Sequence, residues 1–126
     1  MVNFDSPSQL QLIDLVELYQ IGRLDDAEKL AVSLTQKFPQ HPFGWKALGA
    51  VFKAKGRKSE AVDANKTAIA LSPKDSQAHY NLGNIYKELG RLEEAKASYK
   101  RAIALKPSFA EAHNNLGTIF KGLRRL

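Results

Sequence analysis

The chain of 126 residues contains no cysteine. This absence excludes a disulfide framework, a thiolate metal site and a cysteine nucleophile. The sequence also lacks a long apolar run, and this excludes a membrane-spanning helix. We also expect no membrane partner. Residues 1–10 have neither the basic start nor the apolar centre of a secretory signal. These absences are compatible with the cytosol, and we expect a cytoplasmic protein whose length suits one domain.

Basic residues are scarce in the first third of the chain. Residues 1–41 carry three basic and six acidic side chains, whereas residues 42–126 carry sixteen basic and seven acidic ones. The basic residues are scattered among glutamates, and no stripe of aromatic and basic residues suited to nucleic acid appears. We therefore expect solvated helix faces and no nucleic-acid partner.

Helical periodicity, punctuated by glycine and proline, covers the chain, and no segment alternates with period two. The pattern predicts three pairs of helices and a seventh helix that ends near Gly122. Ser6, with Pro7 at the first helical position, is expected to begin the first helix. Asp75 is expected to cap the third pair, and Ser108 with Glu111 the seventh helix.

The sequence repeats itself at a fixed period of about 34 residues, which is typical of a helical repeat array. The repeated positions hold leucine, glycine, an aromatic residue, glycine, alanine, alanine and proline: Leu48, Gly49, Phe52, Gly56, Ala61, Ala68 and Pro73, then Leu82, Gly83, Tyr86, Gly90, Ala95, Ala102 and Pro107. The glycines inside helices predict close approach of the two helices in a pair. Asn65 stands where the next repeat has Tyr99, which predicts looser packing in the second repeat.

Together with Trp45 and Tyr99, these positions resemble the tetratricopeptide repeat. The resemblance covers residues 8–126: a degenerate first repeat (8–41), a second (42–75), a third (76–109) and the first helix of a fourth (110–126). It implies an all-α fold, a right-handed superhelix of antiparallel helix hairpins forming one array over residues 1–126. It also implies a non-catalytic scaffold that binds an extended peptide in a concave groove.

In this family the first helix of each pair lines the groove. The groove residues implied for this sequence begin with Leu12, Val16 and Tyr19 in the first repeat. The peptide-binding candidates are Lys46, Lys53, Tyr80, Asn81, Asn84, Lys87, Asn114, Asn115, Thr118 and Lys121. Asn81 and Asn115 stand one repeat apart, and a carboxamide can pair with both the N–H and the C=O of an extended peptide. A different family template, a lysine, asparagine and arginine clamp for a C-terminal carboxylate, fits poorly because Glu111 stands where it requires a lysine.

No arrangement of residues typical of catalysis is present, and we expect neither an enzyme nor a cofactor. His79 and His113 occupy the column that begins with Trp45. We expect them to be structural, because adjacent repeats, about 10 Å apart, separate two imidazoles too far to share a metal ion. His41 lies in a turn. The acidic residues near Asp25 and Glu93 begin helices, where the helix dipole favours them.

Two alternative functions stay open. The column of asparagines resembles the repeats of O-linked N-acetylglucosamine transferases and their bacterial relatives, and this implies a substrate-recognition arm for an enzyme. The segment from Gly122 to Leu126 resembles the turn at Gly90. We hypothesise that the chain is a piece of a longer protein and that its seventh helix is free to bind another chain, including a second copy.

Overall fold

Three turns of the backbone are made by glycines that recur at equivalent positions of successive repeats. Gly22, Gly56 and Gly90 have φ angles of +82°, +80° and +74°, which glycine adopts without the strain that a Cβ would add. Each of these turns joins the two helices of a hairpin. The computed structural model describes residues 5–125, which form seven α-helices and no strand. The predicted all-α class is confirmed.

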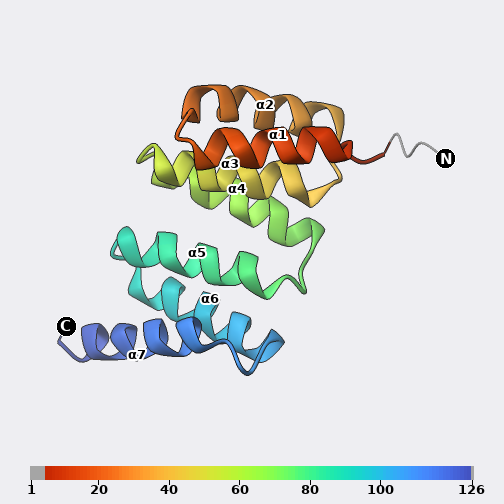
Figure 1. Cartoon of the computed structure of the whole chain (residues 1–126). Helices are drawn as coiled ribbons and strands as arrows, with labels where there is room; N and C mark the ends of the chain where they lie inside the picture. Colours follow the sequence, from red (N-terminus) through yellow and green to blue (C-terminus); the bar gives the residue numbers. More distant parts are fainter. Residues whose placement is uncertain (1–4, 126) are drawn as a thin grey trace. The chain divides into compact units, whose positions relative to one another are not determined.

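The chain divides into two compact units at the boundary between Leu71 and Ser72. The first contains α1 (Gln9–Gln20), α2 (Leu24–Lys37), α3 (Pro42–Ala54) and α4 (Lys58–Leu71), coloured red to green in Figure 1. Helix α2 packs on α1 and on α3, and α3 packs on α4. Its core is mostly aliphatic and includes Leu15, Ala27, Ala31, Leu34, Val51 and Ala61.

The second unit contains α5 (Ser76–Glu88), α6 (Leu92–Leu105) and α7 (Ala110–Arg124), coloured teal to blue in Figure 1. Helix α6 packs on both α5 and α7. Ala102 packs with Phe109 and Ala112, and Tyr80 covers this cluster from α5. Ala102 therefore packs where the first helix of the next repeat begins.

Two of the helical glycines lie under a side chain of the partner helix, as predicted. A Cβ on Gly83 would stand 2.7 Å from Cε1 of Tyr99, and a Cβ on Gly49 would overlap the side-chain amide of Asn65. Asn65 is buried and donates to the carbonyl of Ala61 at 2.8 Å. The expected looser packing at Asn65 is wrong, because its amide occupies the space directly above Gly49. Gly117 has no such neighbour among the described residues.

Helix boundaries differ from the prediction at two starts. Ser8, not Ser6, caps α1: its hydroxyl accepts from the Gln11 N–H at 3.1 Å, and Gln11 accepts from the Ser8 N–H at 2.8 Å. Phe109 precedes α7 and no side chain caps it, so the box expected from Ser108 is absent. Asp75 caps α5 as predicted, accepting from the Ala78 N–H at 3.2 Å.

The seventh helix does not end near Gly122 but continues to Arg124. In the register of the repeats, the residue that corresponds to the left-handed Gly90 is Arg124, not Gly122. An arginine is disfavoured in the left-handed conformation. Residues 122–124 therefore remain helical, whereas α5 ends at Glu88 and the chain turns at Gly90.

Candidate functional site

Four polar side chains of the second unit meet between α5, α6 and α7. Tyr80 and Asn84 lie one turn apart on α5, Tyr99 comes from α6 and Asn115 from α7. We call these four residues the amide cluster. Their spacing follows from the fold, since residues i and i+4 share a helix face and α6 packs against both of the other helices.

Hydrogen bonds join the amide cluster into one network. Oδ1 of Asn84 accepts from the Tyr99 hydroxyl at 2.5 Å and from Nδ2 of Asn115 at 3.0 Å. Nδ2 of Asn115 also lies 3.2 Å from the Tyr80 hydroxyl, to which it donates. The rings pack as well, with the Tyr80 centroid 5.8 Å from that of Tyr99 and 4.8 Å from that of Phe109.

These bonds fix the orientation of both carboxamides. The oxygen of Asn84 and the nitrogen of Asn115 are used inside the cluster. The Asn84 Nδ2 group and the Asn115 Oδ1 atom have no partner among the described residues. Both residues are half-buried. The cluster therefore offers one donor group from α5 and one acceptor from α7 to an incoming polar group.

Tyr99, on α6, supports this arrangement from the buried side of the cluster. Its side chain is fully buried over Gly83, and burial raises the pKa of Tyr99 to about 12. The hydroxyl consequently keeps its proton at neutral pH and remains a donor to Asn84. In the sequence, Tyr99 was interpreted only as a packing residue. One signal in the sequence could have indicated a second role. Tyr99 carries a polar hydroxyl at a repeat position that is buried, and Asn65 carries a polar amide at the same position one repeat earlier.

The other candidates of the second unit do not join this network. Oδ1 of Asn81 accepts from Nε2 of Gln77 at 3.0 Å, so Asn81 and Asn115 make different contacts despite their equivalent positions. On α7, Asn114, Thr118 and Lys121 are exposed, and the Thr118 hydroxyl donates to the backbone carbonyl of Asn114 at 3.2 Å.

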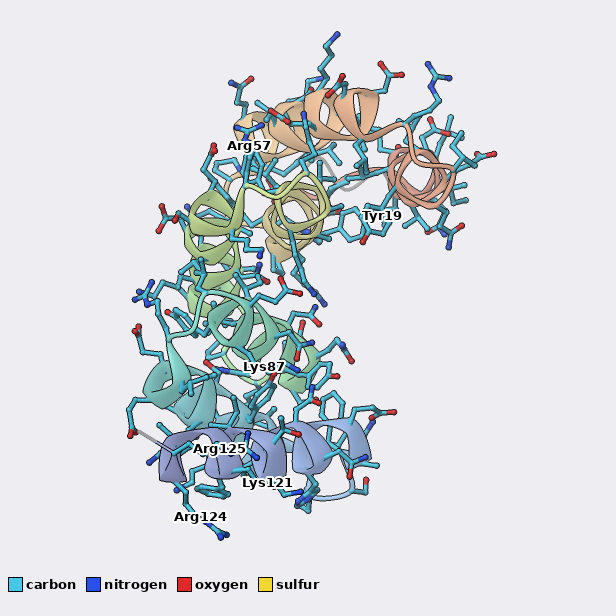
Figure 2. The ribbon with its side chains drawn as sticks, turned by 90° about the vertical axis from the view of Figure 1, so that its left-hand side faces the viewer. Tyr19, Arg57, Lys87, Lys121, Arg124 and Arg125 are labelled. Carbon is cyan, nitrogen blue, oxygen red and sulfur yellow. The ribbon has the colours of Figure 1, made fainter. Side chains whose placement is uncertain are left out.

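Two lysines extend the candidate surface of the second unit. Lys87 lies in the last turn of α5 and Lys121 in the last turns of α7 (Figure 2). Lys87 is half-buried and Lys121 is exposed. They give the C-terminal ends of both helices a positive charge.

In the first unit, the candidates lie on α3 and α1. Lys46 and Lys53 are two turns apart on α3 and both are half-buried. Tyr19, implied as a groove residue, is exposed on α1 and extends toward α3 (Figure 2). Val16 is exposed on the same helix.

A charged cluster that the sequence did not predict joins α2 to the α3–α4 turn. Nζ of Lys55 lies 2.7 Å from Asp25 and 2.8 Å from Glu28. Arg57 lies 2.7 Å from Glu28 and 2.6 Å from Glu60, and it reaches toward α2 in Figure 2. Hydrogen bonds from Lys55 lower the pKa of Asp25 and Glu28, and hydrogen bonds from Arg57 lower that of Glu60.

His79, His113 and the equivalent Trp45 each make the same hydrogen bond, from a ring nitrogen to a proline carbonyl in the turn before the helix. We call this bond the repeated tie. Nε1 of Trp45 donates to the carbonyl of Pro39 at 3.0 Å. Nε2 of His79 lies 3.0 Å from the carbonyl of Pro73, and His113 makes the equivalent bond at 2.9 Å. The predicted structural role of both histidines is thus supported by contacts that the tryptophan shares.

Two features are absent from the described part of the chain. No group of three or more histidine, aspartate or glutamate side chains among residues 5–125 is placed to hold a metal ion. None of the helices formed by these residues has the length and apolar character needed to cross a membrane.

Solved structures with this arrangement of helices include peptide complexes. The first TPR of Spaghetti (RPAP3), bound to an HSP90 peptide, superposes with a TM-score of 0.89 at 23% identity, over 97% of this chain and 99% of that chain. The Yersinia enterocolitica type III secretion chaperone SycD, in complex with a peptide of the translocator YopD, gives 0.82 at 20%, over 92% and 91%.

An enzyme is also among the similar structures. A mutant O-GlcNAc transferase from Thermobaculum terrenum gives a TM-score of 0.79 at 25% identity, over 94% of this chain and 23% of that chain. No curated protein sequence matches the chain. A family model described as TPR repeat matches residues 49–90 and 83–123, which together make up more than half of the chain. With its hairpins, its glycine turns and its regular repeat register, the chain belongs to the tetratricopeptide repeat family.

Proposed function

We propose that this chain is a protein-interaction scaffold and that its amide cluster holds the backbone of an extended peptide. The observation that carries the proposal is the fixed orientation of the two carboxamides, with Nδ2 of Asn84 and Oδ1 of Asn115 left for a ligand. The Spaghetti and SycD structures, similar in fold, each contain a bound peptide.

The chemistry of the two groups suits a peptide bond. The Asn84 amide donates to a peptide carbonyl, and the Asn115 oxygen accepts from a peptide N–H. Because these bonds go to the ligand backbone, they contribute affinity for many sequences. Lys87 and Lys121 are proposed to favour acidic ligand side chains, since they place positive charge near both helix ends. Asn81, Asn114, Thr118, Lys46 and Lys53 remain proposed contacts.

The substitution Asn84→Asp separates ligand binding from support of the fold. A carboxylate still accepts from Tyr99 and Asn115, but it no longer donates to a peptide carbonyl. Ala97→Asp, on an exposed position of α6, adds the same charge away from the cluster and is the matched control. We expect Asn84→Asp to weaken binding about tenfold, the loss of one well-placed hydrogen bond, and the control to leave it unchanged.

The probe is a short peptide selected by the wild-type chain from a random display library, and its affinity is measured by fluorescence anisotropy. Methylating each peptide nitrogen in turn should identify one position where affinity is lost in the wild type. Equal affinity of the wild type, Asn84→Asp and Ala97→Asp, with no position sensitive to methylation, would remove the basis for the proposed clamp.

A second candidate, the substrate-recognition arm of an enzyme, is favoured by the likeness to the O-GlcNAc transferase, of which the chain spans 23%. Sequencing the gene beyond the codon for Leu126 tests it. A nucleotide-sugar domain in the same reading frame would support this candidate. A stop codon would exclude an arm that precedes its catalytic domain in the chain.

A further inference from the structure

Helix α7 presents an apolar face that its equivalent in the preceding repeat keeps buried. In α5, Leu82 and Gly83 are buried, and Gly83 lies under Tyr99 of α6. The corresponding residues of α7 are Leu116, which is half-buried, and Gly117, which is exposed. One turn further along, Phe120 is 40% exposed. This open face contains the small residue that permits close helix approach, with an aromatic side chain beside it.

The surroundings of this face are basic. Lys121 and Arg124 belong to α7 and Arg125 follows it, and Nζ of Lys100 lies 5.8 Å from the centre of the Phe120 ring. Figure 2 shows Arg124 projecting from the side of α7 that points away from α6. An occupant of the open face therefore needs apolar side chains with acidic neighbours.

Helix α1 carries a surface of that description in the first unit. Leu10 is 66% exposed and Ile13 50% exposed. A shallow hollow, lined in part by Ile13, Val16 and Glu17, runs along the same helix. The only charged residues from Gln9 to Ile21 are Asp14 and Glu17, both acidic and both exposed. The two faces are thus alike in apolar character and opposite in charge.

We propose that the open face of α7 binds α1 of a second copy of this chain. In this contact Phe120 enters the hollow beside Ile13 and Val16, and Gly117 allows the two helices to approach closely. Arg124 and Arg125 then lie near Asp14 and Glu17. A second copy is the occupant because every copy carries both surfaces, and because each surface supplies the charge that the other lacks.

The contact is heterologous, since it joins two different surfaces. A pair of copies joined in this way leaves one α1 and one α7 uncovered, so association continues into a longer assembly unless the rotation closes a ring. Salt should weaken it, because the charged residues are exposed and screened by ions. This inference does not rest on the peptide clamp, because the clamp uses Asn84 and Asn115 and none of the residues changed in the test below. Lys121 and Val16 belong to the candidate surfaces of both proposals.

Charge reversal on each surface tests the pairing with the full chain. One variant carries Asp14→Lys and Glu17→Lys, and the other carries Arg124→Glu and Arg125→Glu. All four positions are exposed, and circular dichroism checks that both variants keep the wild-type helix content. Sedimentation velocity over a range of concentrations measures association.

We expect the wild type to show a sedimentation coefficient that rises with concentration, and each variant alone to stay monomeric. An equimolar mixture of the two variants should associate again, because the basic α1 of one meets the acidic α7 of the other. Phe120→Ser should weaken wild-type association about tenfold or more, the usual loss of an aromatic anchor.

Three results would overturn the proposal. A wild type that stays monomeric at every concentration shows that no second copy covers this face. Association of the Asp14→Lys/Glu17→Lys variant alone indicates a contact between two α7 helices. A mixture that remains monomeric removes the pairing of α1 with α7.

Discussion

The contact between Gly83 and Tyr99 allows a quantitative prediction from a single added methyl group. In Gly83→Ala the new Cβ would stand 2.7 Å from Cε1 and 2.8 Å from Cδ1 of the ring. Tyr99 is fully buried and its hydroxyl is bonded to Asn84, so the ring has no free space to enter. Overpacking of this kind costs about 1–3 kcal/mol. Alanine regains up to about 1 kcal/mol over glycine inside a helix, which leaves a net loss of about 0–2 kcal/mol.

Gly117→Ala is the matched control, because Gly117 occupies the same place one repeat later. Apart from its chain neighbours and the backbone of its own helix, no described atom lies within 4 Å of its added Cβ. The helix gain is then not offset by a clash, and we expect stabilisation of up to about 1 kcal/mol. The two substitutions are chemically identical and should have opposite signs.

Urea unfolding followed by circular dichroism measures the difference. With a slope in the middle of the usual range of about 1–3 kcal/mol per molar urea, the midpoint of Gly83→Ala should fall by up to about 1 M, and that of Gly117→Ala should rise. The reasoning would be refuted by a Gly83→Ala midpoint at or above that of Gly117→Ala. It would also fail if Gly117→Ala lost as much stability as Gly83→Ala.

Three further predictions concern charge, burial and the repeated tie. Lys55→Gln should lower the urea midpoint at pH 7 and lose this effect as the pH falls. Lys55 depresses the folded-state pKa of Asp25 and Glu28 below 3.8 and 4.5, so the stability it adds exists only while both are ionised. In an alkaline absorbance titration of tyrosinate, the difference between wild type and Tyr99→Phe should titrate near pH 12, and a midpoint near the ordinary tyrosine pKa would contradict the burial. His79→Trp should preserve the thermal midpoint, because the preceding repeat makes the same bond with an indole N–H, whereas His79→Phe should lower the free energy of unfolding by about 0.5–1.5 kcal/mol.

Features that depend on the repeat itself could be predicted from the sequence. The register of the repeats located the turns at Gly56 and Gly90, and the glycines inside helices indicated where partner helices cross. These predictions succeeded because each depends on one residue type whose size or backbone freedom has few alternatives.

The failures fall where several residues can serve the same purpose. Ser6 and Ser8 are both able to cap a helix, and only the path of the chain decides that Ser8 does so. The end of α7 was placed at a glycine near the chain terminus, whereas the register puts Arg124 at that position.

Three members of the amide cluster, Tyr80, Asn84 and Asn115, could be predicted from the sequence as candidates, but the hydrogen bonds that join them could not. Asn81 and Asn115 are equivalent in the repeat, yet Asn115 bonds to Asn84 and Tyr80 while Asn81 bonds to Gln77. Periodicity identifies the helix face on which a side chain lies, but not which neighbour completes its hydrogen bonds. That choice depends on contacts between residues of different helices, far apart in the chain.

The three histidines use their ring nitrogens in opposite ways. A carbonyl can only accept, so Nε2 of His79 and His113 must carry hydrogen to bond Pro73 and Pro107. His41 is the reverse case, because its Nδ1 accepts from the Phe43 N–H at 3.2 Å at the start of α3, so this nitrogen carries no hydrogen. The same residue type therefore donates to the turn before two of the helices and accepts from the first turn of a third.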